Sequence, residues 1–203
     1  MCRICTAVRN AIHGRRQTAK PINPVHPTTF SNEQEQALLA TIMKMPNGID
    51  LRDIVIVMLS SGIRRGELER LKWSNIDLNA GALHADHRYV PLSGDVIAVL
   101  AERATRVQSD YVMGQHPVIA ITKASRDLKL AASSIGLPGL TWHDLRHTFA
   151  ARCVASGMPV EVLCSLGGWS IASLNTILKR TVVAPAQVKE EWNNAMNALE
   201  GTN

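Results

Sequence analysis

Apolar positions along the chain repeat mostly at the three- and four-residue spacing of an amphipathic helix. A proline-rich stretch at residues 21–27 marks a boundary, because proline blocks helix continuation and favours extended backbone before it. After this boundary the spacing predicts a helix over residues 31–45 and a second helix over residues 51–60, which Gly62 ends. A short third helix is predicted to begin near Arg64.

The periodicity then changes to the alternation that is typical of strands. Short strands are predicted from Trp73 to Leu78, at residues 82–85 and at residues 88–92, and the last two form a hairpin. Another short strand is predicted at residues 118–121. The chain is therefore expected to be mainly α with a small antiparallel β-sheet. The remaining helices are predicted at residues 93–107, 123–134, 142–156, 159–166, 170–180 and 186–199.

Composition sets broad limits on the class of protein. The chain has 203 residues, 46% of them hydrophobic, which is enough for one globular core. No apolar run approaches the roughly 20 residues that span a bilayer, and the first residues lack the apolar segment of a signal peptide. A cytoplasmic protein without membrane association is therefore expected. The net charge of +5 and the isoelectric point near 9.3 admit a polyanionic partner without naming one.

Part of the positive charge gathers at the N-terminus, where no acidic residue precedes Glu33. This segment is expected to be a phosphate-contacting arm through residues such as Arg15, Arg16 and Lys20, and a solvated tail is the alternative. Cys2 and Cys5 form a C-x-x-C pair there, but no second pair follows at zinc-finger spacing. No metal site is therefore predicted at these cysteines.

The sequence H-D-L-R-H at residues 143–147 carries the clearest chemistry. Residues three and four apart share one face of a helix, so His143, Arg146 and His147 are expected to project together. A guanidinium group can hold two phosphate oxygens, and an imidazole can move a proton at neutral pH, so this face suits a phosphodiester. The plain alternative is a helix with a satisfied histidine and a surface arginine.

A sharper alternative is a zinc-dependent hydrolase that uses His143 and His147, because H-D-x-x-H resembles the zinc-protease pattern. Asp144 is one methylene shorter than the glutamate base of that pattern, and Arg146 would place a cation beside the metal. No third ligand is evident from the sequence. The phosphodiester interpretation is therefore preferred.

A second cluster, S-G-I-R-R-G-E-L at residues 61–68, adds another arginine. Glu67 lies three residues after Arg64, close enough on a helix to orient it. Two separated arginines that clamp one phosphate would stabilise a pentacoordinate transition state electrostatically. Taken alone, Arg64 and Glu67 form a surface ion pair. The pair indicates a phosphate site only because a second arginine, Arg146, occurs in a separate motif.

Five motifs in order resemble the catalytic domain of the tyrosine recombinase, or phage integrase, family from about residue 28 to residue 203. They are S-G-I-R-R-G-E-L, L-K-W-S-N-I-D-L, R-Y-V-P-L, T-W-H-D-L-R-H-T-F-A and L-G-G-W-S. The resemblance implies the tyrosine recombinase catalytic fold over residues 28–203. Residues 1–27 resemble the end of the family's core-binding domain and its linker. The family resemblance also implies DNA integration and recombination on double-stranded DNA, self-association on DNA, and no cofactor.

The resemblance also implies roles for single residues. Arg64 and Arg146 would grip the scissile phosphate, His143 would assist proton transfer, and Glu67 and His147 would support them. Trp169 would donate a hydrogen bond from its indole N–H, although a core anchor is an equal alternative. The basic residues expected to contact DNA are Arg15, Arg16, Lys20, Arg65 and Arg88.

The chain departs from the family at the nucleophile. The resemblance requires a tyrosine nine to eleven residues beyond Trp169, but residues 170–185 contain none, and Arg180 or Thr181 occupies the position. The hairpin also lacks the family's lysine, which His84, His87 or Arg88 would have to replace. DNA binding is therefore predicted and strand transfer is not. The alternative is an active enzyme whose nucleophile is Tyr89 or a tyrosine from a partner subunit.

Overall fold

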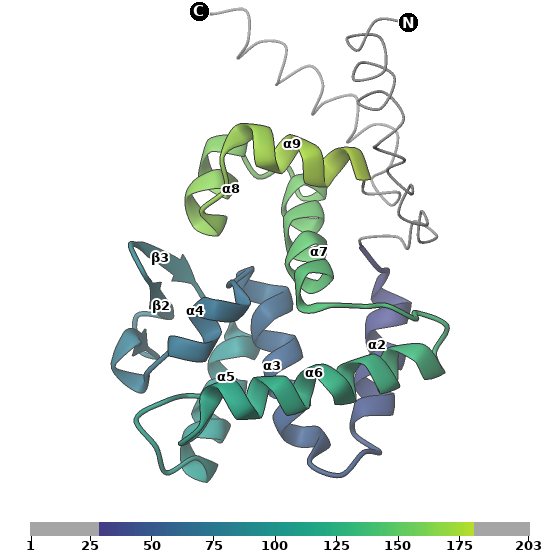
Figure 1. Ribbon diagram of the computed structural model, residues 1–203. Coiled ribbons are helices and arrows are strands. Elements are labelled where there is room, and N and C mark those ends of the chain that lie inside the picture. The colour runs from purple at the N-terminus through teal and green to yellow at the C-terminus, as the bar shows by residue number, and fades with distance from the viewer. Residues whose placement is uncertain (1–28, 181–203) are drawn as a thin grey trace, which may run out of the picture.

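The computed structural model describes residues 29–180, apart from the side chains of the last two. The fold is mainly helical with one small antiparallel sheet, as the sequence predicts, and the strand order is β1-β2-β3 (Figure 1). The elements are α2 (Asn32–Ile42), α3 (Gly48–Ser61), α4 (Arg65–Arg70), the 3-10 helix η1 (Trp73–Asn75), β1 (Ile76–Asp77), β2 (Ala82–Ala85), β3 (Arg88–Pro91), α5 (Gly94–Arg106), α6 (Pro117–Ser134), α7 (Trp142–Ala155), α8 (Val160–Gly167) and α9 (Ile171–Arg180).

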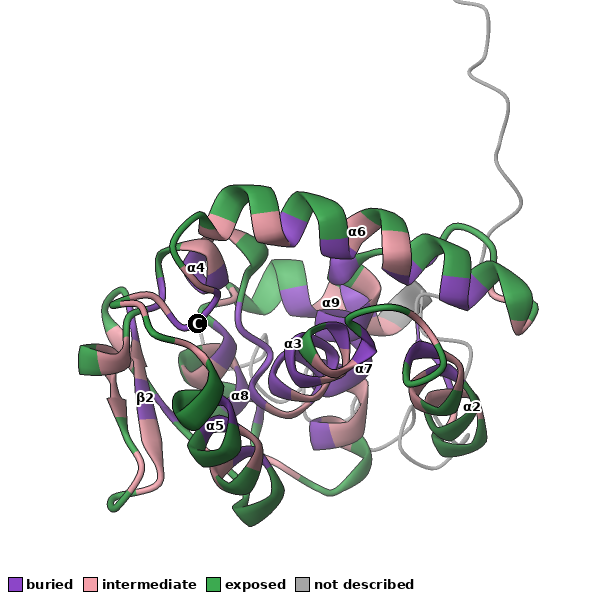
Figure 2. Cartoon of the chain, turned by 90° about the horizontal axis from the view of Figure 1, so that it is seen from below, coloured by how far each residue is buried: buried purple, intermediate pink, exposed green. Residues whose placement is uncertain are grey.

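Helix α3 lies at the centre of the molecule, with buried residues on most of its surface (Figure 2). Helices α2, α5, α6 and α7 all pack against it. Helix α7 leads from this body to α8 and α9, which lie together at the other end of the molecule (Figure 1). A second apolar cluster joins α7, α8 and α9 through Phe149, Leu163 and Leu174. Helix α8 also contacts β3, so the hairpin and the C-terminal helices meet.

Local interactions determine the start of α2 and the end of α3. Ser31 caps α2, because its hydroxyl accepts the Gln34 N–H while the Gln34 side chain accepts the Ser31 N–H at 2.8 Å. Gly62 ends α3 in the left-handed region with a φ of 59°. A β-carbon at Gly62 would also run into the ring of Phe149 on α7. Gly62 therefore allows both the turn into Arg64 and the close approach of α7.

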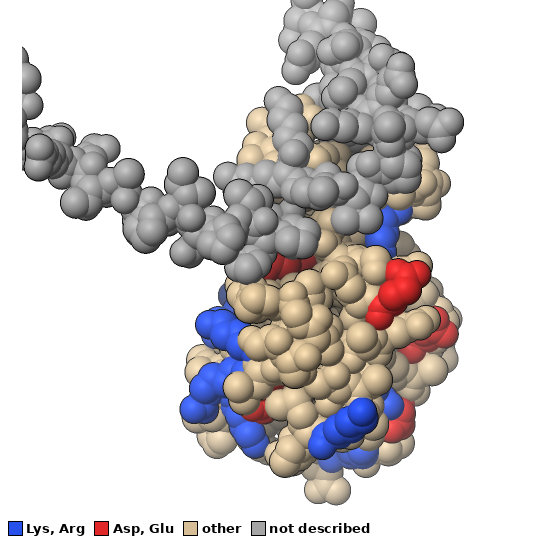
Figure 3. Space-filling view, turned by 90° about the vertical axis from the view of Figure 1, so that its right-hand side faces the viewer, with Lys and Arg blue, Asp and Glu red and all other residues tan. Residues whose placement is uncertain are grey.

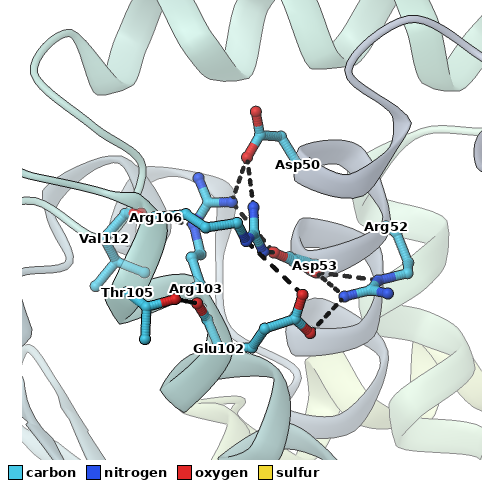
Figure 4. A network of polar contacts seen from close by, with 8 residues as sticks. All are labelled: Asp50, Arg52, Asp53, Glu102, Arg103, Thr105, Arg106 and Val112. Carbon is cyan, nitrogen blue, oxygen red and sulfur yellow. Dashed lines mark hydrogen bonds and ion pairs between the residues drawn. The ribbon is translucent and has the colours of Figure 1, made fainter.

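An ion-pair network joins α3 to α5 (Figure 4). Asp53 is fully buried and accepts hydrogen bonds from Arg52 at 2.9 Å and from Arg106 at 2.6 Å. Arg103 also donates to Asp53, and it bonds Asp50 at 2.8 Å and the Val112 carbonyl at 2.8 Å. This network anchors the helix from which the chain runs through Gly62 into Arg64.

Three predictions about local structure were wrong. Residues 118–121 form the first turns of α6 and not a strand, because Pro117 occupies the first turn, where it favours a helix. The strand predicted from Trp73 to Leu78 is reduced to Ile76–Asp77 after a 3-10 turn. Helix α2 ends at Ile42, three residues before the predicted end. The helix predicted at residues 186–199 lies outside the described residues.

Candidate functional site

A cavity of about 750 Å³ brings together the residues that the sequence singles out. Its wall contains residues from α4, α7, the loop after α8, and α9. The predicted site residues that line it are Arg64, Arg65, His143, Arg146, His147 and Trp169. These positions are up to 105 residues apart in the sequence (Arg64 to Trp169), so the fold assembles one site from separate motifs.

Helix α7 presents the predicted face of H-D-L-R-H to this cavity. The rings of His143 and His147 lie 4.0 Å apart between centroids in an edge-on arrangement. His143 is exposed to solvent, whereas His147 and Arg146 are buried. The exposed imidazole can therefore reach a bound group, while Arg146 meets it from the floor of the cavity.

Arg146 is only 3% exposed, and no acidic side chain among residues 29–178 lies within ion-pair distance of it. Its two terminal nitrogens donate to the carbonyls of Gly62 and Gly167. Its guanidinium carbon lies 4.0 Å from the centroid of the Trp169 ring. The pKa of Arg146 is lowered to about 9, mainly by burial and then by the positive charge of Arg64, with a smaller contribution from Arg88 and an opposing one from Glu67. A phosphate beside this group would relieve an unbalanced positive charge.

Glu67 is the carboxylate at the centre of the arginines and is 4% exposed. It accepts the Arg64 backbone N–H at 2.7 Å and the Arg64 Nη1 at 2.8 Å, as the sequence predicts for residues three apart. Desolvation raises the pKa of Glu67, but the hydrogen bonds and charges of Arg88 and Arg64 outweigh it and lower the pKa to about 2. Glu67 is therefore ionised and holds Arg64 in a fixed direction.

Arg88 on β3 makes the most extensive contacts of the group. Both of its terminal nitrogens donate to Glu67, one of them at 2.7 Å, and its Nε donates to the Leu166 carbonyl at 2.6 Å. Its side chain is 11% exposed. The DNA contact predicted for Arg88 stays a prediction, but the structure shows that its guanidinium is already engaged.

The end of α8 supplies three successive carbonyl groups to the three arginines. Arg88 bonds the carbonyl of Leu166, Arg146 that of Gly167, and Arg64 that of Gly168. The last carbonyls of a helix have no partner within it and carry its negative dipole end, so they suit guanidinium groups.

The two glycines at this helix end are required by the close contacts. Gly168 has a φ of 64°, and a β-carbon there would lie 2.9 Å from Arg64 Nη2. A β-carbon at Gly167 would overlap the ring of Trp169. The Gly-Gly-Trp sequence thus lets the backbone approach the arginines.

Trp169 packs in the apolar core as the anchor alternative expects, and it also lines the cavity. Its ring stacks on Phe149 with centroids 6.4 Å apart and packs against the apolar cluster of α7, α8 and α9. The same ring lines the cavity and covers the Arg146 guanidinium. The predicted hydrogen bond from its indole N–H to a phosphate stays a prediction.

Other predicted residues lie at the edge of the site or away from it. Arg65 is exposed at the cavity rim and bonds Glu69 at 2.8 Å. Tyr89 is 73% exposed and contacts His84 on the hairpin face opposite to Arg88, because neighbours in a strand alternate. Neither Tyr89 nor Tyr111 lines the cavity. Arg15, Arg16, Lys20 and Thr181 lie outside the described residues, as does the side chain of Arg180.

The zinc alternative finds no support in the described residues 29–180. No group of three histidine, cysteine, aspartate or glutamate side chains within them is arranged to hold a metal ion. The guanidinium of Arg146 lies on the same helix face as both imidazoles. Among the same residues, no helix is both long and apolar enough to cross a membrane.

Sequence reasoning missed two parts of the site. Ser173 and Thr176 of α9 line the cavity opposite α7 and contribute hydroxyl groups. The carbonyl acceptors of Gly62, Gly167 and Gly168 were also not foreseen. Backbone acceptors have no side-chain signature, although two adjacent glycines before a tryptophan are a signal of close backbone approach.

Charge elsewhere on the surface is mixed. The side of the molecule drawn in Figure 3 carries basic side chains mainly along its left and lower edges and acidic side chains mainly on its right, with a broad uncharged area between them. That face offers no single-sign surface for a polyanion.

Residues 28–178 match the model of the phage integrase family. A tyrosine recombinase XerC of Staphylococcus aureus is 30% identical over 202 residues, which cover 86% of this chain and 66% of that protein. The integrase of Salmonella phage P22 is 25% identical over 160 residues, or 69% of this chain and 41% of the integrase. The chain thus spans less than two thirds of the length of both relatives.

Solved structures share the fold. The crystal structure of XerA recombinase aligns with a TM-score of 0.65 at 23% identity, covering 86% of this chain and 65% of that chain. The Tn1549 transposon integrase in complex with circular intermediate DNA aligns with a TM-score of 0.68 at 17% identity, covering 93% of this chain and 73% of that chain. At these identities the likeness establishes the fold.

Proposed function

The chain belongs to the phage integrase family, and from this premise we propose that it binds double-stranded DNA as the phosphate-gripping domain of a site-specific recombinase. The observation that carries this proposal is the convergence of Arg64, Arg146 and His143 on one cavity. A phosphodiester fits there, because two guanidinium groups can hold its non-bridging oxygens while the exposed imidazole reaches a bridging oxygen.

DNA binding is part of the proposed function, and strand transfer is not. Covalent catalysis in this family needs a tyrosine, and the sequence has only two. Tyr89 is exposed and does not line the cavity, and Tyr111 forms a bridge with Lys72 and packs under its ammonium group. Ser173 and Thr176 line the cavity, but the Ser173 hydroxyl bonds the Ser170 hydroxyl and the Thr176 hydroxyl donates to the Ala172 carbonyl. Neither the sequence nor the described geometry supplies a nucleophile of the expected kind.

The division of the chain is part of the proposal. We assign residues 1–27 to a basic arm that contacts DNA through Arg15, Arg16 and Lys20, and residues 28–203 to the integrase-like domain. The start of the family match at residue 28 supports this boundary. Self-association on DNA belongs to the same proposal, because the relatives that resemble the chain are recombinases.

Salt dependence tests the DNA-binding proposal. Affinity for a short fluorescein-labelled duplex of mixed sequence is measured by fluorescence anisotropy across a series of salt concentrations. The logarithm of affinity should fall linearly with the logarithm of salt, by about 0.9 for each phosphate contact. Arg126→Ala serves as a control, because Arg126 is exposed on α6 and does not line the cavity. An affinity that stays flat with salt would refute the proposal.

A covalent-trapping experiment tests the absence of strand transfer. The protein is incubated with a pool of nicked duplexes of randomised sequence, in which the cleaved end diffuses away. Denaturing electrophoresis should then show no slow-migrating adduct. An adduct that disappears in Tyr89→Phe would establish the displaced nucleophile, and an adduct that survives this change would point to another residue or to a tyrosine from a partner subunit.

A further inference from the structure

Arg88 links two elements that hold the candidate phosphate site. It bonds Glu67, which orients Arg64, and it bonds the Leu166 carbonyl at the end of α8, next to the turn that carries Trp169. We propose that Arg88 is a positioning residue, which aligns Arg64 and the Gly167–Trp169 turn for phosphate binding without touching DNA itself. This inference rests on the proposed function, because it concerns the same cavity.

The donors of Arg88 are directed inward. A guanidinium group has five N–H donors, and Arg88 uses donors on Nε, Nη1 and Nη2 for Glu67 and Leu166. Its side chain is 11% exposed, compared with 46% for Arg64 and for Arg65. Arg88 is also absent from the cavity wall. A phosphate contact would require breaking this buried pair, whereas Arg64 can accept one in place.

The contact with Glu67 transmits the effect of Arg88 to Arg64. Glu67 bonds both the backbone N–H and the Nη1 of Arg64, so any rotation of its carboxylate turns that guanidinium. Arg88 holds both oxygens of the carboxylate in a two-pronged arrangement. A lysine at position 88 would keep the charge and lose this fork. The Arg88→Lys substitution therefore separates the effect of the charge of Arg88 on Glu67 from the effect of its two-pronged hydrogen bonding.

The contact with Leu166 transmits the effect to the other side of the cavity. The next two carbonyls along the chain bond Arg146 and Arg64, so a shift of the α8 end moves the partners of both arginines. The end of α8 also places Trp169 over Arg146. Arg88 thus links the hairpin to the end of α8 beside the phosphate site.

The decisive experiment compares Arg88→Lys and Arg88→Met with Arg65→Ala in the full chain. DNA affinity is measured by anisotropy with a short labelled duplex of mixed sequence across a salt series. A positioning residue predicts that both Arg88 variants lose about tenfold in affinity, typical of coupled charges in one network, with an unchanged salt slope. Retention of affinity in Arg88→Lys, together with a slope lowered by about one in Arg88→Met, would overturn the proposal.

A pH profile supplies a readout that loss of packing alone would not move. The charged groups that face Glu67 are Arg64 from the start of α4, Arg88 from β3 and Arg146 from α7. Removal of Arg88 takes away the largest of the charged partners that lower the pKa of Glu67. DNA binding by Arg88→Met should therefore weaken at a higher pH than binding by the wild-type protein as the solution is acidified. If DNA affinity falls at the same acidic pH in both proteins, the proposal is contradicted.

A measurement on the wild-type protein covers the case in which the variants do not fold. The Nε–Hε resonances of the arginines are followed in ¹H–¹⁵N NMR spectra while the duplex is added. The Arg64 resonance should move and the Arg88 resonance should stay, whereas movement of Arg88 as the main change would overturn the proposal. If the wild-type protein does not bind DNA, the proposed function fails. Arg88 is then tested by whether Arg88→Lys shifts the Arg64 resonance in the free protein.

Discussion

Two arginine clusters in this molecule differ in how their charge is balanced. Between α3 and α5, the three arginines of the network in Figure 4 meet three acidic residues, with Asp53 fully buried among them. At the candidate site, Arg64 and Arg88 share the carboxylate of Glu67, whereas Arg146 donates only to backbone carbonyls. Arg64 and Arg88 also donate to backbone carbonyls at the end of α8. The paired residues of the first cluster are Arg52, Arg103 and Arg106 with Asp50, Asp53 and Glu102.

This difference separates a structural role from a binding role. A cluster with matched charges satisfies itself and gains nothing from an added anion. A cluster with surplus positive charge held by neutral acceptors is prepared for an anion, because the fold has already met the cost of bringing the arginines together. The first cluster should therefore determine stability, and the second should determine DNA affinity.

The largest effect is expected from Asp53→Ala in the structural network. Removing this buried carboxylate leaves Arg103 and Arg106 with only the half-exposed Asp50 as a shared partner, which should lower the free energy of unfolding by about 3–5 kcal/mol. Urea denaturation measures this change, with exposed Asp95→Ala as a control expected to stay within about 0.5 kcal/mol. A loss equal to that of the control would show that the network is not structural.

Arg146→Ala should produce the opposite pattern. DNA affinity should fall at least about 30-fold, because Arg146 is the buried cation at the floor of the cavity. Stability should fall less than in Asp53→Ala, since the change also removes repulsion from Arg64 and Arg88. Anisotropy and urea denaturation give the two quantities. A large loss of stability with unchanged affinity would make Arg146 structural.

Acid stability should depend on Glu67. Its pKa lies near 2 in the folded protein and at 4.5 ordinarily, so ionised Glu67 stabilises the fold above pH 4.5. This contribution is lost as the pH falls from about 4.5 towards 2. Thermal unfolding across this range should show a shallower decline for Glu67→Gln than for the wild-type protein. Parallel declines would contradict the role assigned to Glu67.

A smaller effect is expected from Gly168→Ala, compared with Gly157→Ala as a matched control. Both glycines have positive φ, so each change should cost about 1 kcal/mol of stability. Only at Gly168 does the added β-carbon meet the Arg64 guanidinium, because Gly157 faces open space. DNA affinity should therefore fall in Gly168→Ala alone. Equal affinities in the two variants would argue against the α8 carbonyls as supports of the site.

The smallest effect is expected at the rim of the cavity. Arg65 is exposed and paired with Glu69, and exposed pairs contribute little to stability. Arg65→Ala should change the free energy of unfolding by no more than about 0.5 kcal/mol. It should lower the salt slope of DNA binding by about one. Glu69→Ala, which frees the same arginine, serves as the control and should not lower the slope. An unchanged slope in Arg65→Ala would remove Arg65 from the interface.

The sequence was informative where side-chain chemistry and chain geometry coincide. Residues of H-D-L-R-H had to share a helix face, and Gly62 had to end a helix, because both follow from local backbone geometry. The strand predicted at residues 118–121 was wrong because a run of four apolar residues does not distinguish a strand from the start of a helix. Arg88 could not be interpreted from its position, since its partner Leu166 lies 78 residues away and bonds through its backbone.

Arginine side-chain NMR during a DNA titration tests the contrast between the two clusters most directly. We expect the Nε–Hε resonances of Arg64 and Arg146 to move as a duplex is added, while those of Arg103 and Arg106 stay in place. Movement of Arg103 and Arg106, with Arg64 and Arg146 unchanged, would contradict it.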